Sequence, residues 1–329
     1  MPAEGSVVPR FAGARVLVIG DLMLDEFVWG TVSRISPEAP VPVVNVTGET
    51  YYPGGAANVA RNLRDLGAGV ALMGIVGEDS SGDRLCRLLA KAGIETDGVQ
   101  HIAGVPTTVK TRIIARHQQI VRVDREQPAK MRAAQRQRVI ADIREAMDRV
   151  DGVVVADYGK GLLDQDLADC ICRAARERAK VLAVDPHPHT SLVWMGATAI
   201  KPNRIEAFNA AGMKLEAPVE PPLSDKALLA AAGRLLQTWQ PGSLLVTLGE
   251  QGMMLFRSGE APYHIPTHAK EVFDVSGAGD TAIAVFTLGL LAGAAPRLAA
   301  ELANRASGIA VGKLGTATVT PAELEASFA

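Results

Sequence analysis

Short apolar runs alternate with segments of helical periodicity along most of this sequence. The first run, residues 15–19 (RVLVI), ends at Gly20-Asp21 and predicts a buried strand followed by a turn. In residues 56–66 the apolar positions recur at helical spacing, and Gly67 follows as a C-terminal cap. The same patterns predict strands at 70–75, 153–156, 181–185, 199–201 and 244–248, and helices at 83–92, 164–178 and 226–239. This alternation predicts an α/β protein with a mostly parallel sheet and helices on both faces.

Two stretches depart from the alternation. Residues 41–46, and the pair 107–115 with 119–124, have the pattern of antiparallel ribbons. Because they are inserted after the first strands of an α/β core, they predict a small β lid, which we place near residues 22–53 and 103–125. An edge extension of the main sheet is the alternative. Uncovered strand edges favour pairing with another chain, so we also expect a homodimer through the lid strands.

Composition and charge exclude several classes of protein. Of the 329 residues 48% are hydrophobic and 4% aromatic, which fits an α/β core built from Ala, Val, Leu and Gly. The length alone permits one large domain or two, and we expect a single domain, 1–329. The formal charge of −2 gives no electrostatic footprint for nucleic acid or an anionic membrane. The longest apolar stretch, 281–295, is shorter than the roughly 20 residues of a membrane span and predicts a buried helix. Residues 1–9 lack signal-peptide features, so we expect a soluble, cytoplasmic protein.

Residues 274–281 (DVSGAGDT) directly precede this apolar stretch. Their glycines allow a tight turn that presents unpaired backbone N–H groups at a helix N-terminus. Such a cradle attracts anions and would stabilise charge developing on a transferred phosphoryl group. Asp280 falls in the first turn, where the helix dipole favours the ionised carboxylate, so it can accept a proton from an attacking hydroxyl. A glycine turn with an Asp cap is the structural alternative.

Two other glycine patterns match cofactor motifs only in part. Residues 277–282 fit the dinucleotide fingerprint G-x-G-x-x-A, but no hydrophobic strand precedes them, and Asp280 stands where a pyrophosphate would approach. The segment from Gly308 to Lys313 is one residue short of the Walker spacing, and Leu314 replaces the required Ser or Thr. Neither pattern predicts a dinucleotide site or a P-loop.

Polar side chains also occur where predicted strands end and helices begin. Residues 54–60 (GGAANVA) open a helix and place Asn58 in its first turn, where an amide suits sugar hydroxyls. Asp21 and Asp25 follow the first strand, at the edge where α/β sheets bind ligands. A turn cap and a solvated carboxylate are the structural alternative for these two.

Two further turns lie later in the chain. Asn203 and Glu206 have the spacing of a capping box, and a role in orienting Mg²⁺ and phosphates through water is the functional alternative. Residues 247–252 (TLGEQG) follow a predicted strand and form a flexible turn suited to lie under a nucleotide.

Together, and in this order, these segments resemble the ribokinase-like (PfkB-type) carbohydrate kinases over essentially the whole chain. GGAANVA and DVSGAGD match the two signatures of that family. The resemblance implies a three-layer sandwich with a small β lid, ATP and Mg²⁺ as cofactors, Asp280 as catalytic base, and Gly277, Ala278 and Gly279 as an anion hole. It further places Asn203, Glu206 (near Mg²⁺ through water), Thr247, Gly249, Gly252 and Asn304 at the nucleotide, and Asp21, Asp25, Gly55 and Asn58 at the sugar.

Within that family, the sequence is most similar to the D-glycero-β-D-manno-heptose 7-phosphate kinases of lipopolysaccharide core synthesis. The similarity lies in residues 33–43, 53–60, 118–119, 157–161 and 311–316. It implies transfer of the ATP γ-phosphate to the C1 hydroxyl of heptose 7-phosphate, giving the 1,7-bisphosphate. A kinase for another sugar or sugar phosphate is the alternative, and a non-catalytic sugar-phosphate sensor is a more distant one.

An acceptor that already carries a 7-phosphate needs a basic clamp. The candidates are Lys160, Arg61, Lys110 and Arg112, near the segments expected to frame the sugar. Lys160 ranks first because the glycines on both sides leave room for a ligand. For each of the four, a solvated side chain on an exposed face is the structural alternative.

Overall fold

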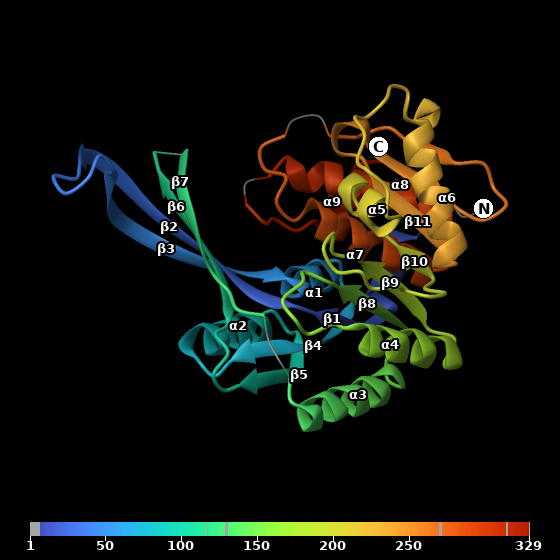
Figure 1. The fold of residues 1–329 in the computed structure, drawn as a ribbon, viewed down its shortest axis with the longest axis horizontal. Coiled ribbons are helices and arrows are strands. Elements are labelled where there is room, and N and C mark those ends of the chain that lie inside the picture. Colours follow the sequence, from blue (N-terminus) through green and yellow to red (C-terminus); the bar gives the residue numbers. More distant parts are fainter. Residues whose placement is uncertain (1–6, 117, 129–130, 270–271, 314, 329) are drawn as a thin grey trace.

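The computed structural model describes residues 7–116, 118–128, 131–269, 272–313 and 315–328. In this part of the chain the main sheet contains nine strands (Figure 1). Its order is β13-β12-β11-β10-β9-β8-β1-β4-β5. The strands are β1 (Arg15–Gly20), β4 (Gly69–Gly77), β5 (Glu95–Ile102), β8 (Gly152–Ala156), β9 (Val181–Asp185), β10 (Ala199–Ile200), β11 (Ser243–Thr247), β12 (Met253–Phe256) and β13 (Tyr263–Ile265). All neighbours from β11 to β5 are parallel, while β12 and β13 are antiparallel. The predicted mostly parallel sheet is therefore confirmed; residues 1–6 and Leu314 lie outside the described residues.

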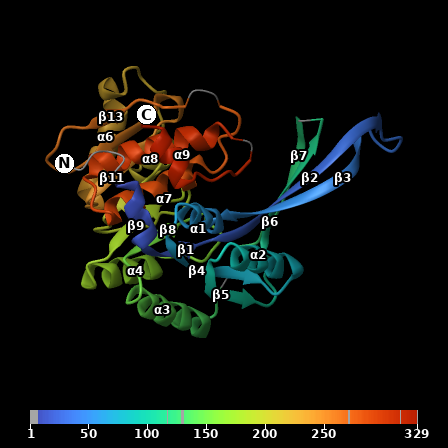
Figure 2. The ribbon, with the colours of Figure 1, turned by 180° about the vertical axis from the view of Figure 1, so that it is seen from behind.

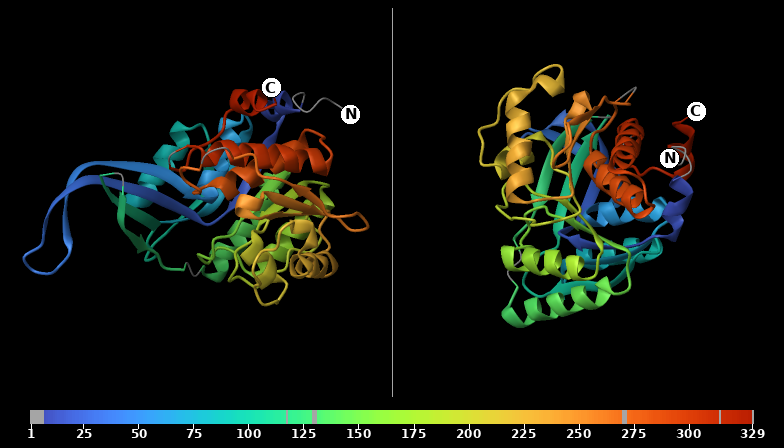
Figure 3. Two further views of the ribbon diagram at one scale, coloured as in Figure 1. Left: turned by 90° about the horizontal axis from the view of Figure 1, so that it is seen from above. Right: turned by 90° about the vertical axis from the view of Figure 1, so that its right-hand side faces the viewer.

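Helices cover both faces of this sheet, and the alternation of side chains along β1 shows how. Val16 and Val18 belong to the core under α1, α2, α7 and α8, whereas Leu17 and Ile19 face the core under α3, α4, α5 and α6. The two helical layers lie on opposite sides of the sheet in Figure 3. The helices are α1 (Ala56–Asp65), α2 (Ser80–Lys91), α3 (Ala133–Met147), α4 (Gln165–Glu177), α5 (Arg204–Ala210), α6 (Lys226–Thr238), α7 (Ala278–Leu291), α8 (Pro296–Val311) and α9 (Pro321–Ala326).

The apolar stretch near the C-terminus is the buried helix α7. Residues 280–289 are all buried, because α7 packs between the sheet and the helices α1 and α8. A helix that is apolar on every side needs such a position. Among the described residues, no helix combines the length and the apolar character that crossing a membrane requires.

The remaining strands form a second, smaller sheet of order β3-β2-β6-β7. It comprises β2 (Leu22–Ile35), β3 (Pro42–Gly55), β6 (Thr108–Ala115) and β7 (Gln118–Arg125). The β2–β3 and β6–β7 pairs are antiparallel, and β2 pairs with β6 in parallel. The distal part of the β2–β3 hairpin extends away from the body of the molecule (Figure 2). A small β lid is thus confirmed, and the alternative of an edge extension of the main sheet is wrong.

Candidate active site

Asp280 lies in the first turn of α7, at the carboxyl edge of the parallel strands. The helix begins at Ala278, and its N-cap residue Gly277 has the left-handed conformation, with φ of +83°. A side chain is strained at such a φ, so glycine suits this position. The predicted glycine turn followed by a helix with Asp280 in its first turn is therefore present.

Both carboxylate oxygens of Asp280 accept a hydrogen bond. Asn58 Nδ2 on α1 donates to Oδ2 at 2.6 Å, and the Tyr158 hydroxyl donates to Oδ1 at 2.5 Å. Burial raises the pKa of Asp280 to about 6, and the two hydrogen bonds limit the rise because they stabilise the charged form. Asp280 is thus mostly ionised at neutral pH, yet it binds a proton more readily than an exposed aspartate.

Two backbone N–H groups beside Asp280 are available to an anion. The first intrahelical bond of α7 runs from Thr281 N to Gly277 O, and Ala278 N donates to Val275 O at 3.3 Å. The N–H groups of Gly279 and Asp280 precede that first bond and therefore have no intrahelical acceptor. The Ala278 amide takes part in a turn instead, and a role of this cradle as an anion hole stays a prediction.

Lys201 places an ammonium group next to this cradle. It directly follows β10, and a Cβ atom added to Gly279 would lie 3.3 Å from Lys201 Nζ. Its Nζ pairs with Asp185 Oδ1 at 3.0 Å. Burial alone would lower the pKa of Lys201, but the charges of Asp185 and Glu206 raise it above the ordinary value. No role for Lys201 was predicted from the sequence, although its position at the end of a strand, before Pro202-Asn203, is a usable signal.

Asn203 and Glu206 form the capping box that their spacing predicts. Asn203 Oδ1 accepts from Glu206 N at 2.9 Å, and Glu206 Oε2 accepts from Asn203 N at 2.7 Å, at the start of α5. Burial raises the pKa of Glu206, while the Lys201 charge opposes the rise. The structural alternative is therefore present, and a role for the pair at Mg²⁺ and phosphate stays a prediction.

A cleft of about 470 Å³ opens on one side of the cradle; we call it the β11–α8 cleft. Its lining contains all four residues predicted to line the adenine nucleotide, Thr247, Gly249, Gly252 and Asn304. Gly279 of the cradle also lines it. Much of the remaining wall is apolar, with Met253, Val272, Val275 and Val311. A pocket with an apolar wall and a few polar groups fits a flat aromatic ring joined to polar substituents.

A second cleft, of about 430 Å³, lies beside the small sheet; we call it the small-sheet cleft. Phe27, Trp29 and Tyr52 line it together with two arginines, Arg61 and Arg112. Residues 273, 274 and 276 line this cleft, while 275, 278 and 279 line the other. The segment that leads into Asp280 therefore separates the two clefts.

Two buried side-chain oxygen atoms near the start of α7 lack a hydrogen-bond partner among the described residues. They are Asn58 Oδ1 and Thr316 Oγ1, and Thr316 lines the small-sheet cleft. A Cβ atom on Gly277 would approach both residues, which places them at the start of α7. Buried polar atoms without partners are costly, so a ligand with hydroxyl groups is a suitable partner.

The two predicted sugar-binding carboxylates have partners within the protein. Asp21, which is 4% exposed, accepts from the backbone N–H groups of Tyr158 and Lys160 at 3.0 Å and of Leu162 at 3.3 Å. Asp25 pairs with Arg112 at 2.5 Å. Contacts of these carboxylates with a sugar stay predictions, and in this structure Asp21 holds the loop after β8.

Gly55, also predicted at the sugar, forms the junction between β3 and α1. Its φ is +59°, and a Cβ atom there would lie 2.6 Å from the carbonyl oxygen of Asp21. The structure therefore requires glycine here to bring α1, with Asn58, close to the end of β1.

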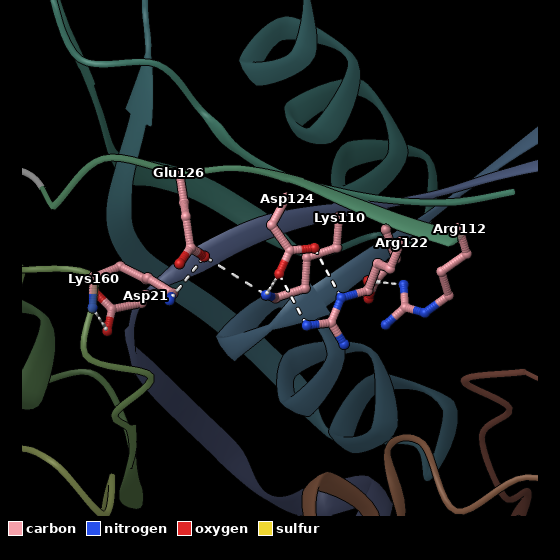
Figure 4. Close-up of polar contacts among 8 residues, drawn as sticks. Asp21, Lys110, Arg112, Arg122, Asp124, Glu126 and Lys160 are labelled. Atoms are coloured by element: carbon pink, nitrogen blue, oxygen red, sulfur yellow. Dashed lines mark hydrogen bonds and ion pairs between the residues drawn. The ribbon is translucent and has the colours of Figure 1, made fainter. Parts of the chain in front are cut away.

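The four basic candidates separate into two groups. Arg61 and Arg112 line the small-sheet cleft. Lys160 does not; its Nζ pairs with Glu126 Oε2 at 2.8 Å. Lys110 pairs with Asp124 at 3.0 Å and with Glu126 at 3.6 Å, which joins both lysines in one network (Figure 4).

Comparisons with known proteins agree with this architecture. The family model described as pfkB family carbohydrate kinase matches residues 14–323. The chain is 44% identical over 321 residues to the bifunctional protein HldE of Desulfatibacillum aliphaticivorans, covering 98% of this chain and 64% of that protein. It is also 44% identical to the protein of the same name from Geobacter metallireducens, covering 98% and 65%. The chain thus spans about 64% of the length of these relatives.

Solved structures match the fold over nearly the whole chain. The ribokinase of Arabidopsis thaliana, complexed with ribose and ATP, has a TM-score of 0.72 at 18% identity, covering 95% of this chain and 98% of that one. Phosphofructokinase-2 of Escherichia coli, in complex with potassium, has a TM-score of 0.75 at 18% identity, covering 96% and 98%. At this identity the matches establish the fold, and they confirm the predicted ribokinase-like sandwich.

Proposed function

The chain belongs to the pfkB family of carbohydrate kinases, and we propose that it transfers the γ-phosphate of ATP to the C1 hydroxyl of D-glycero-D-manno-heptose 7-phosphate. The product would be the 1,7-bisphosphate, an intermediate in the synthesis of ADP-heptose for the lipopolysaccharide core. The observation that carries the proposal is that the segment leading directly into Asp280 lines two clefts of different chemistry. The relatives named HldE support the choice of a heptose.

ATP would occupy the β11–α8 cleft. The apolar wall suits the adenine ring, with Thr247 and Asn304 as the nearby polar side chains. The phosphates would then point toward the N–H groups of Gly279 and Asp280 and toward the Lys201 ammonium, the positive end of the site.

The acidic groups behind the cradle fit a magnesium ion. Burial raises the pKa values of Asp185 and Glu206, so a cation would be favoured there because it stabilises their charged forms. Carboxylate oxygens are ligands that Mg²⁺ prefers. The described residues contain no cluster of three or more metal-binding side chains, so Glu206 would hold the ion through water, with Asn203 beside it. When bound, Mg²⁺ neutralises charge on the transferred phosphate.

The phosphorylated sugar would occupy the small-sheet cleft. Aromatic side chains provide a surface for the sugar ring, and Asn58 Oδ1 would accept from a hydroxyl close to Asp280. We assign the terminal phosphate to Arg61 and Arg112, since a guanidinium binds phosphate in a bidentate fashion and both side chains line the cleft. Lys160, which ranked first in the sequence, does not line this cleft and is the weaker candidate.

In the proposed reaction, Asp280 takes the proton from the C1 hydroxyl as its oxygen attacks the γ-phosphorus, the bond from that phosphorus to the β–γ bridging oxygen breaks, and ADP leaves. The cradle N–H groups and Lys201 stabilise the charge on the transferred phosphoryl group. The small sheet closes over the sugar and excludes water, which limits hydrolysis of ATP. We further propose that the enzyme acts in the cytoplasm as a homodimer joined through strands of the small sheet.

An acceptor panel tests this proposal. ATP consumption would be measured with heptose 7-phosphate, the unphosphorylated heptose, fructose 6-phosphate and ribose. We expect the highest kcat/KM for heptose 7-phosphate and a loss of at least about tenfold without the phosphate, because charged hydrogen bonds contribute about 1.5–3 kcal/mol. A preference for ribose or free heptose would identify another sugar kinase. Binding of heptose 7-phosphate without ATP consumption would identify a sensor.

A further inference from the structure

We infer that Tyr158 is a positioning residue for Asp280, and that its loop, residues 157–162, is fastened to the small sheet through Lys160 and Glu126. This inference rests on the proposed function, in which Asp280 is the catalytic base. It assigns a role to a side chain for which the sequence patterns predicted none.

The first observation is the contact between Tyr158 and the base. The hydroxyl donates to Asp280 Oδ1 at 2.5 Å, and Asn58 holds the other oxygen at 2.6 Å. Two donors from different elements, the loop after β8 and helix α1, fix the rotation of the carboxylate. Burial and the neighbouring Asp280 charge raise the pKa of Tyr158 well above its ordinary value, so the hydroxyl keeps its proton and donates.

The second observation is that hydrogen bonds to Asp21 and Asp157 hold the backbone of this loop. Asp21 accepts from the backbone N–H groups of Tyr158, Lys160 and Leu162, which are every second residue of the loop. Asp157 accepts from Gly159 N at 2.9 Å and from Thr190 Oγ1 at 2.5 Å. These five hydrogen bonds hold the backbone on both sides of Tyr158 and so fix the position from which its side chain extends to Asp280.

The third observation is the attachment to the small sheet. Lys160 Nζ pairs with Glu126 Oε2 at 2.8 Å, and Glu126 directly follows the end of β7 (Figure 4). Lys110 on β6 reaches the same carboxylate at 3.6 Å. This ion pair therefore connects the small sheet to the loop that carries Tyr158.

Other charged groups around Asp280 do not belong to this loop. Asp185 at the end of β9 raises the pKa of Asp280, and Lys201 after β10 lowers it. The charge of Asp25 on β2 raises the pKa of Tyr158. These groups remain in place when only the Tyr158 hydroxyl is removed, so a change in the pH profile reports on that hydroxyl.

Tyr158→Phe tests the inference through the acid limb of the pH–rate profile. The wild type should lose kcat/KM as the pH falls through about 6, because Asp280 becomes protonated. Without the Tyr158 hydroxyl, the ionised Asp280 carboxylate loses a hydrogen-bond donor and its pKa rises. The acid limb should therefore move up by about one pH unit. We expect kcat at pH 7 to fall about tenfold to a hundredfold, with the KM for ATP unchanged.

Tyr51→Phe is the matched control. The Tyr51 hydroxyl donates to Glu49 Oε2 at 2.5 Å, which is the same kind of contact, and neither residue lines either cleft. This variant should keep the wild-type profile. A Tyr158→Phe enzyme that is less stable but has the wild-type limb would overturn the inference, because a structural defect alone does not change the pKa of the base.

Glu126→Gln tests the attachment to the small sheet. Removal of a negative charge by itself would move the acid limb down, whereas a loosened Tyr158 contact moves it up. We expect the acid limb of Glu126→Gln to move up by less than that of Tyr158→Phe. In the double variant the limb should move no further than in Tyr158→Phe alone, because the ion pair then has no Tyr158 hydroxyl to position. A downward shift, or additive shifts, would overturn the attachment. The control is Glu145→Gln on α3, where Glu145 forms an exposed pair with Arg149.

Failure of the proposed function has a different signature. If the wild type phosphorylates no sugar phosphate, or if Asp280→Asn retains its turnover, the function or the base is wrong. If both of those results are as expected and the Tyr158→Phe limb does not move, only the present inference is wrong.

Discussion

Asp280 is a carboxylate held where its charge is disfavoured. Burial raises its pKa to about 6 from the usual 3.8, and hydrogen bonds from Tyr158 and Asn58 compensate in part. A base needs a pKa close to the working pH, so this cost to folding is consistent with a role in proton transfer.

Asp280→Asn should therefore stabilise the fold while it removes activity. At pH 7 the Asp280 carboxylate is ionised in both the folded and the unfolded protein. Burial of this charge costs free energy in the folded state, and the neutral amide of asparagine avoids that cost. A rise in pKa from 3.8 to about 6 corresponds to about 3 kcal/mol, so we expect a gain of about 1–3 kcal/mol in the free energy of unfolding.

The pH dependence of the stability gain in Asp280→Asn shows whether burial of the charge causes it. As the pH falls from 7 to 5, folded Asp280 takes up a proton before the unfolded chain does, so the cost falls to about half and the advantage of the variant should shrink with it. Urea unfolding at both pH values measures it. An advantage that does not vary with pH would show that charge burial is not responsible.

Arg61 and Arg84 offer a matched comparison for phosphate recognition. Each lies over a tyrosine of β3, Arg61 over Tyr52 and Arg84 over Tyr51, and consecutive residues of a strand face opposite sides of a sheet. Arg61→Met should raise the KM of heptose 7-phosphate by about tenfold or more, because a charge-assisted hydrogen bond is lost. Arg84→Met should leave that KM unchanged. Equal KM values for the wild type and Arg61→Met in steady-state assays would remove Arg61 from the phosphate site.

At the scale of elements, helix α5 begins with the capping box of Asn203 and Glu206, for which we also propose a role at Mg²⁺ and phosphate. Asn203→Ala should lower the free energy of unfolding by about 1 kcal/mol through the lost cap alone. If Asn203 also acts at Mg²⁺ and phosphate, the KM for ATP should rise as well. Thermal unfolding and ATP titration of the same preparations separate the two effects.

Thr320→Ala is the control for that experiment. Thr320 and Glu323 form the same reciprocal cap at the start of α9, outside the linings of both clefts. It should lose similar stability and keep the wild-type KM. If Asn203→Ala behaves in the same way, Asn203 is a helix cap without a role at the nucleotide.

Periodic elements were predictable from the sequence, and elements with mixed patterns were not. Helix α1 and strand β8 have clear helical or apolar patterns and lie where we expected them. Helix α3 buries only Val139, Ile143 and Met147, and the charged residues between them obscure the period. Strand β2 was not predicted as a strand along its length, because Asp21 and Asp25 favoured a ligand-binding turn and its distal half is largely exposed.

The site was predictable to the extent that local spacing determines it. The turn before Asp280, the first turn of α1 and the 203–206 cap each lie within a few residues of sequence. The contacts of Tyr158 and Lys201 with the start of α7 link residues far apart in the chain, and only the strand order brings them together. The same limit applies to Lys160, whose partner Glu126 depends on the path of β7.

At the scale of the whole molecule, the small sheet has two open edges, β3 and β7. Every residue of β7 is exposed, including Val121 and Val123 at 45% and 53%. Uncovered apolar strands favour association, which supports the proposed homodimer. Val123→Lys should convert the dimer to a monomer in light scattering, because a charge on the face would be buried without a partner.

Val219→Lys is the control for the oligomeric state. Val219 is 42% exposed but lies outside the small sheet, so this variant should remain a dimer. A wild-type monomer, or a Val123→Lys dimer, would contradict association through these strands.

The junction at Gly55 also limits how such a protein can change during evolution. β3 ends at Gly55 and α1 begins at Ala56, so no linker separates the small sheet from the helix that carries Asn58. An insertion at this point would displace the amide from the base, whereas insertions at the distal end of the β2–β3 hairpin, residues 36–41, would leave the site intact. We therefore expect length differences between homologues to accumulate at the hairpin tip, and the junction to keep a constant length while acceptor preference diverges.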